Sequence, residues 1–122
     1  MSRRQGNARE LTDNERGILE TILTSADVRG AVDLLAQVKR TRVIGGLPTL
    51  LDLRVDQAAV PVDIPDGPIP ARAIVESDGG KLIGEILIWV AKGFLDGLEF
   101  AWVSDEAPAE FPPPSSIRVL TR

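Results

Sequence analysis

The stretch from Lys81 to Val103 limits what this chain can fold into more than any other part of the sequence. It holds both tryptophans and two of the three phenylalanines, and apolar residues run along it on either side of Gly93. A glycine at this point suits a three-residue hairpin loop that is closed by a left-handed residue. The stretch therefore predicts a long antiparallel hairpin in which Val90 lies opposite Phe94.

This register also predicts which side chains share a face of the hairpin, because side chains alternate along a strand. One face would carry Leu82, Gly84, Ile86 and Ile88, opposite Trp102, Phe100, Leu98 and Asp96. Asp96 is the one charged residue on this otherwise apolar face, and it lies near enough to the turn to reach water. We expect the helices to cover this face.

A second turn signal precedes the hairpin. Ser77-Asp78-Gly79-Gly80 contains Asp-Gly between two apolar runs, which is a strong two-residue turn pattern. The resulting register pairs Arg72 with Glu85 and Glu76 with Lys81, and both charge pairs are complementary. Three strands are therefore predicted as a meander, at about 71–77, 81–90 and 94–103.

The N-terminal third of the chain favours helices. Thr12 and Glu15 have the spacing of a capping box, and a helix is predicted from there to about Leu23, with Ile18, Leu19, Ile22 and Leu23 as its apolar stripe. A second helix is predicted from Thr24 or Ser25 to about Lys39, with its apolar stripe at Val28, Val32, Leu35 and Val38. Strands at about 42–45 and 50–55 follow, and a proline-rich connection occupies 56–70.

These elements predict an α+β fold in which two N-terminal helices pack on one face of a four- or five-stranded antiparallel β-meander. Residues 1–10 are expected to form a disordered N-terminal tail. Residues 11–122 are expected to form a single domain with a proline-rich C-terminal tail, which Phe111, Ile117, Val119 and Leu120 would anchor.

Composition narrows the classes of function. The chain has no cysteine and no histidine, which removes thiol chemistry, the commonest metal ligands and the usual general base near neutral pH. We therefore expect no cofactor and no metal site. No apolar run approaches the ~20 residues of a membrane span, and no signal-peptide core begins the chain. A soluble, cytoplasmic protein without a membrane partner is the expectation.

The second face of the meander is the first candidate site. The predicted register puts an apolar patch there, formed by Leu87, Trp89, Leu95 and Val103. Exposed apolar clusters often mark partner sites, and tryptophan is a frequent interface anchor. The leading hypothesis is therefore a non-enzymatic protein-interaction module that binds a protein partner or forms a homodimer. The alternative is that the C-terminal tail folds over this patch.

The same face offers a polar alternative. The register aligns Arg72, Glu85 and Glu99 in one row across three strands, and two carboxylates so close could supply a general acid. This would suit a small-molecule-binding domain or a weak hydrolase that uses Glu85 and Glu99. The structural interpretation is that Arg72 neutralises Glu85 while Glu99 is solvated, which suits a flat sheet face without an enclosed pocket.

Two further patterns bear on nucleic acid. Lys39-Arg40-Thr41-Arg42 closes the second predicted helix, where cations favour the helix dipole; a phosphate-binding patch is the alternative interpretation. The motif Leu-Thr-x-x-Glu-x-x-Ile-Leu from Leu11 to Leu19 also resembles the first helix of winged-helix DNA binders, which gives a second alternative function. Nucleic acid is not expected as a partner, because no third, recognition helix is predicted and the net charge is −4.

Two motifs carry a resemblance. Leu11-Thr12-x-x-Glu15-Arg16-x-Ile18-Leu19 and Gly97-Leu98-Glu99-Phe100-x-Trp102 are similar to segments of a group of small uncharacterised single-domain proteins of high-GC bacteria. The resemblance spans roughly residues 10–113 and implies one bacterial domain. Members of that group often carry several cysteines near the segment that is Val43 to Thr49 here. This chain has none, so no metal or redox role is implied.

Overall fold

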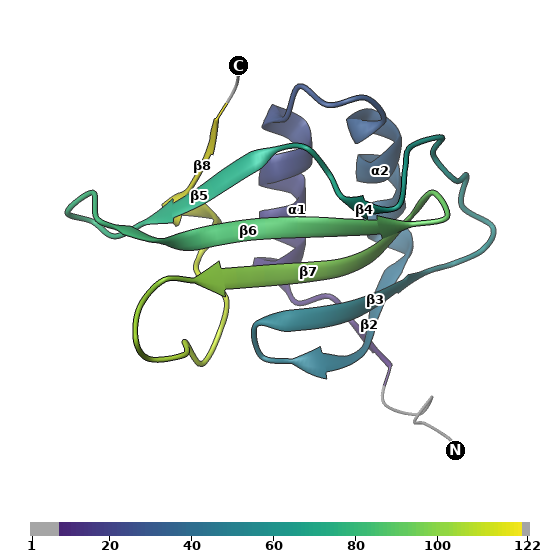
Figure 1. Ribbon diagram of the computed structural model, residues 1–122. Helices are drawn as coiled ribbons and strands as arrows, with labels where there is room; N and C mark the ends of the chain where they lie inside the picture. The colour runs from purple at the N-terminus through teal and green to yellow at the C-terminus, as the bar shows by residue number, and fades with distance from the viewer. Residues whose placement is uncertain (1–7, 121–122) are drawn as a thin grey trace.

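One antiparallel sheet forms the front of the molecule, and two helices lie behind it (Figure 1). This is a computed structural model, and it describes residues 8–120. The α+β class, the two helices and the antiparallel sheet agree with the sequence-based expectation. The strand count does not, because the sheet has eight strands.

The helices are α1 (Asp13–Ser25) and α2 (Ala31–Gln37), and short 3₁₀ turns follow at Val38–Arg40 and Pro114–Ser116. The strands are β1 (Arg9–Glu10), β2 (Thr41–Leu47), β3 (Leu50–Val55), β4 (Gly67–Pro68), β5 (Arg72–Glu76), β6 (Leu82–Ala91), β7 (Phe94–Trp102) and β8 (Ile117–Leu120). Their order in the sheet is β1-β2-β3-β7-β6-β5-β8, with β4 beside one end of β6. The three strands that the sequence did not predict, β1, β4 and β8, are only two to four residues long.

The N-terminal tail was expected to include residues 1–10. Residues 1–7 lie outside the described part of the chain, whereas Arg9 and Glu10 form strand β1, which pairs with β2. Short strands of this kind carry no period-2 signal that a sequence can show.

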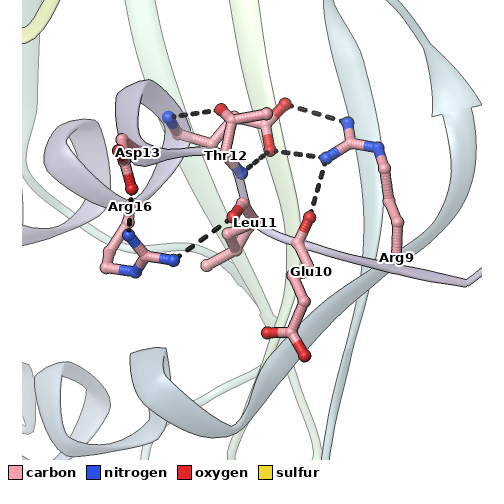
Figure 2. Close-up of polar contacts among 7 residues, drawn as sticks. Arg9, Glu10, Leu11, Thr12, Asp13 and Arg16 are labelled. Carbon is pink, nitrogen blue, oxygen red and sulfur yellow. Dashed lines mark hydrogen bonds and ion pairs between the residues drawn. The ribbon is translucent and has the colours of Figure 1, made fainter.

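The capping box at the start of α1 is confirmed (Figure 2). The Thr12 hydroxyl oxygen accepts a hydrogen bond from the Glu15 amide at 3.1 Å, and a Glu15 carboxylate oxygen accepts one from the Thr12 amide at 2.9 Å. Two orphan amides of the first turn are thereby satisfied. The predicted apolar stripe of α1 is also confirmed, because all four side chains are at most 2% exposed: Ile18, Leu19, Ile22 and Leu23.

Helix α2 starts later than predicted, and its predicted apolar stripe is only partly confirmed. It begins at Ala31 after Gly30, whose φ of 85° is left-handed. Helix α1 already ends at Ser25, where the following Ala26 is extended. Val32, which the sequence placed in the core, is 79% exposed, and the buried positions are Ala31, Leu34 and Val38. Of the other predicted stripe residues, Val38 lies in the core and Val28 and Leu35 pack against it, so the predicted stripe fails only at Val32.

The β6–β7 hairpin exists, but its predicted register is wrong. Ala91 pairs with Phe94, so the loop has two residues, and both Lys92 (φ 53°) and Gly93 (φ 83°) are left-handed. Such a turn matches the twist of the strands better than the predicted loop does. A β-bulge then lets Val90 pair with Leu95 and Trp89 with Gly97, which leaves the exposed Asp96 outside the ladder. The bulge removes a charge from the core face.

The turn before β6 also differs in register. Glu76 pairs with Leu82, and after a second irregularity Val75 pairs with Gly84, so the predicted pairs of Glu76 with Lys81 and Arg72 with Glu85 are not direct neighbours. The Ser77 amide instead bonds to the Lys81 carbonyl at 2.9 Å. The turn is therefore wider than the predicted two-residue turn.

The C-terminal tail returns on the helix side of the sheet (Figure 1). Phe111 is 7% exposed, and its ring lies 6.3 Å from that of Phe100, measured between ring centroids. Strand β8 then pairs with β5, and Ile117 and Val119 pack against the core cluster. The predicted anchoring of the tail is confirmed for Phe111, Ile117 and Val119, whereas Leu120 is half-buried in β8 without packing against the core cluster. The tail anchors away from Trp89.

Candidate functional site

The outward face of the sheet, opposite the helices, is the candidate site, and we call it the outer face. Figure 1 views the sheet from this side, and no helix or other described segment crosses in front of β5, β6 and β7. The strand register brings side chains of four strands into one transverse row on this face: Leu47, Leu50, Glu99 and Leu87. A neighbouring row contains Asp52, Gly97 and Trp89.

The side chain of Trp89 contacts strand β7. It pairs with Gly97, and a Cβ built on Gly97 would lie 3.4 Å from the Cβ of Trp89 and 3.5 Å from its Cδ1. The indole Nε1 donates a hydrogen bond to a Glu99 carboxylate oxygen at 3.0 Å. Trp89 is consequently half-buried within its own chain.

Two of the four predicted patch residues keep their place on this face. Leu87 and Trp89 are half-buried there, and Val103 is 62% exposed at the far end of β7. Leu95 is different: it is 1% exposed and belongs to the core, because the bulge at Asp96 reverses the side on which Leu95 points. The predicted placement of Leu95 is therefore wrong.

Leu47 and Leu50 take the place of Leu95 in the apolar set. They face each other across the tight β2–β3 turn and are 62% and 36% exposed. Leu50 shares its face of β3 with Asp52 and Arg54 and alternates with the buried Leu51, Leu53 and Val55, so the sequence pattern did carry a signal for Leu50. The signal for Leu47 was hidden because the predicted strand ended at Gly45. We use the name outer apolar set for Leu47, Leu50, Leu87 and Trp89.

The predicted polar row is only partly assembled. Arg72 and Glu85 form an ion pair at 2.9 Å, although they are diagonal neighbours. Glu99 lies opposite Leu87, whereas Glu85 lies opposite Ala101, so the two carboxylates are not in one row. Glu85 is bound by Arg72 and Glu99 by Trp89 on an open face, which leaves no paired acid and base.

Three ion pairs between neighbouring strands balance the charge of the outer face. They join Arg42 to Glu10 at 3.2 Å, Arg72 to Glu85 at 2.9 Å, and Arg118 to Glu76 at 3.1 Å. In Arg118 the pair with Glu76 raises the pKa of the guanidinium above its ordinary value, first through the hydrogen bond and then through the opposite charge. The face is thus close to neutral in a chain of net charge −4.

Within residues 8–120, Glu15 is the one buried carboxylate, and its contacts are structural. It is 8% exposed, and Arg9 binds both of its oxygens at 2.9 Å (Figure 2). Burial acts to raise the pKa of Glu15, but hydrogen bonds from Arg9 and from Thr12 outweigh it and hold that pKa below its ordinary value. The same hydrogen bond raises the pKa of Arg9. Glu15 is therefore ionised and fully bonded, which is unsuited to a general acid.

Residues 8–120 offer neither a metal-site cluster nor a membrane-spanning helix. No group of three or more acidic side chains in this range is placed to hold a metal ion. No helix in this range is long and apolar enough to span a bilayer.

Comparison with known proteins does not assign this chain to a family. No protein-family model, no curated protein and no solved structure matches the chain. The resemblance to small proteins of high-GC bacteria accordingly stays a prediction, and the functional argument depends on the outer face itself.

Proposed function

We propose that this chain is a non-enzymatic protein-interaction module, and that its outer face binds the same face of a second copy. The observation that carries the proposal is the outer apolar set, which lies on a broad sheet face that no described segment covers. A face with one apolar zone and matched charges can pair with itself about a twofold axis.

Apolar area supplies the driving force. Leu47 and Leu50 keep much of their surface in water, and Leu87 and Trp89 are half-exposed beside them. Each Å² of apolar surface that a partner removes from water contributes about 25 cal/mol. Tryptophan near the centre of such a patch is a common source of binding energy.

Size and charge favour a second copy as the occupant. Strands lie ~4.8 Å apart and rise ~3.3 Å per residue, so the seven, six, five, ten and nine residues of β2, β3, β5, β6 and β7 offer roughly 590 Å². This is below the ~800 Å² per partner of a standard interface and suits a weak dimer. Because its ion pairs are already closed, the outer face of one copy presents little like charge to another.

Sedimentation velocity on two matched variants tests this proposal. Leu87→Glu places a charge in the outer apolar set, whereas Val32→Glu makes the same change at a side chain that is 79% exposed on the helix side. The wild-type chain and Val32→Glu are expected to sediment as dimers at tens of micromolar, and Leu87→Glu as a monomer. A wild-type chain that stays monomeric at millimolar concentration would overturn the second copy as occupant. Dimers that form equally well in Leu87→Glu would overturn the outer face.

The two alternative functions have less support. A hydrolase using Glu85 and Glu99 would need an enclosed pocket, and both groups lie on an open face with a bound partner each. A winged-helix protein needs a third helix to enter the major groove, and residues 8–120 contain only α1 and α2 as α-helices.

A further inference from the structure

A basic hollow lies where the 3₁₀ turn Val38–Arg40 leads into β2 and where β3 ends. It is open to solvent and has a volume of about 770 Å³. Four cationic side chains line it together with two carboxylates: Lys39, Arg40, Arg42, Arg54, Glu10 and Asp56. Two positive charges are therefore in excess here, in a chain whose net charge is −4.

Two of these cations face each other across the strands. Arg42 and Arg54 are direct cross-strand partners in the β2–β3 ladder, a placement that is destabilising for like charges. Glu10 neutralises Arg42 at 3.2 Å. Arg54 takes part in no ion pair within residues 8–120. An anion bound beside both arginines would offset their repulsion.

The dipole of α2 and of the 3₁₀ turn that follows it does not explain why four basic side chains gather at this hollow. Cations near a helix C-terminus can satisfy its last carbonyls, but those carbonyls already have donors. Gln37 O accepts from the Thr41 hydroxyl at 2.8 Å, Val38 O from the Thr41 amide, and Arg40 O from the Asp56 amide at 3.0 Å. The basic side chains remain available to a ligand.

We propose that this hollow binds a small phosphate-bearing ligand, a phosphate monoester or a diphosphate. Guanidinium groups bind phosphate oxygens in a bidentate manner, and a dianion matches the two excess charges. The contact between Arg40 and Asp56 is long, at 3.8 Å, so Arg40 can turn toward a ligand at small cost. The volume lies within the range of small-molecule sites. This proposal does not depend on self-association, although Arg42 and Glu10 belong both to the hollow and to the outer face.

The experiment is a titration of the ¹⁵N-labelled full chain with sodium pyrophosphate, with sodium chloride keeping the ionic strength constant. Amide shifts are expected to concentrate in residues 39–42 and 54–57, with a Kd below about 1 mM. Arg54→Gln should weaken binding about tenfold or more, because a charge-assisted contact is lost. Arg29→Gln makes the same charge change at an exposed arginine that does not line the hollow, and its Kd should stay within about twofold of wild type.

Ribose 5-phosphate and a 20-base-pair duplex distinguish the sources of phosphate. Shifts in the same amides with ribose 5-phosphate, at equal or weaker affinity than pyrophosphate, would support the proposal. Tighter binding of the duplex than of pyrophosphate through these amides would overturn it in favour of a nucleic-acid surface. It would also be overturned if pyrophosphate moved no amide in these segments, or if the Arg54 and Arg29 variants lost affinity equally. Arg54 is exposed, so its variant should fold, and the amide spectrum verifies this.

Discussion

The side-chain oxygen of Gln37 accepts a hydrogen bond from the backbone amide of Leu95 at 3.0 Å, inside the core. Strand β3 pairs with β7 only between Gly97 and Glu99, so Leu95 has no strand partner on that side. The Gln37 amide nitrogen donates at 2.9 Å to the carbonyls of Val60 and Gly93. One side chain, 1% exposed, thus replaces a missing strand and ties α2 to the β6–β7 turn.

Replacing Gln37 by leucine should therefore destabilise the fold strongly. The variant keeps the approximate volume but leaves the Leu95 amide buried without an acceptor, and the expected loss is about 3 kcal/mol of unfolding free energy. Urea unfolding measures this loss. Gln57→Leu, at an exposed position in the loop after β3, serves as the control and should change stability by less than about 0.5 kcal/mol. Equal unfolding midpoints in the two variants would contradict the proposed role of Gln37.

Acid should weaken the N-terminal helix through Glu15. Its pKa in the folded state is lowered from an ordinary value of 4.5, so its contribution is present above that value and is lost as pH falls through the lower, folded pKa. Thermal unfolding between about pH 6 and pH 3 should show wild-type stability falling with acid, and a shallower fall in Glu15→Gln. Glu20→Gln, on the exposed side of α1, should keep the wild-type slope. A wild-type slope in Glu15→Gln as well would mean that other carboxylates govern the acid response.

Gly84 should tolerate no side chain. A Cβ at this position would lie 2.4 Å from the Ala101 carbonyl oxygen and 2.9 Å from both Phe100 Cε1 and Trp102 Cα. Two of these neighbours are backbone atoms, so the hairpin itself must shift, and Gly84→Ala should cost about 1–3 kcal/mol.

The control for Gly84→Ala is a substitution at another glycine, in the turn between β5 and β6. Gly79→Ala, in the turn before β6, meets only the Ser77 hydroxyl at 4.0 Å and should be close to neutral. Chemical unfolding of both alanine variants makes the comparison. A neutral Gly84→Ala would show that β6 and β7 are less closely packed there.

Local chemistry made part of the fold predictable, and long-range geometry made the rest unpredictable. Thr12 and Glu15 sit three residues apart and act within one turn, so the capping box was readable from the sequence. Asp96 was recognised as a misfit on an apolar face, but a single misfit does not tell a bulge from a solvent-reaching side chain. The short strands β1, β4 and β8 depend on neighbours far along the chain.

The candidate site, too, was predictable where local sequence patterns decide it and unpredictable where the strand register decides it. Leu87 and Trp89 lie on the predicted face of β6, because both come before the register shift between Trp89 and Val90. Leu95 lies between the turn and the bulge in β7, so its side chain points into the core instead. Arg54 looked like one polar position of an alternating strand, and its opposition to Arg42 required the β2–β3 register. Gln37 lies in the middle of a helical pattern, where no sequence rule marks a residue that completes a distant strand.

Phe111 holds the C-terminal tail on the helix side of the sheet, away from the outer face. The ring of Phe111 packs near Phe100, which is 3% exposed, on the helix side of the sheet. Phe111→Ala should cost about 3 kcal/mol through the cavity it leaves. In a Trp102→Phe background only Trp89 emits, and its emission maximum in the folded state should be the same with and without Phe111→Ala. A red shift of several nanometres in the folded variant would mean that the tail, rather than solvent or a second copy, covers Trp89.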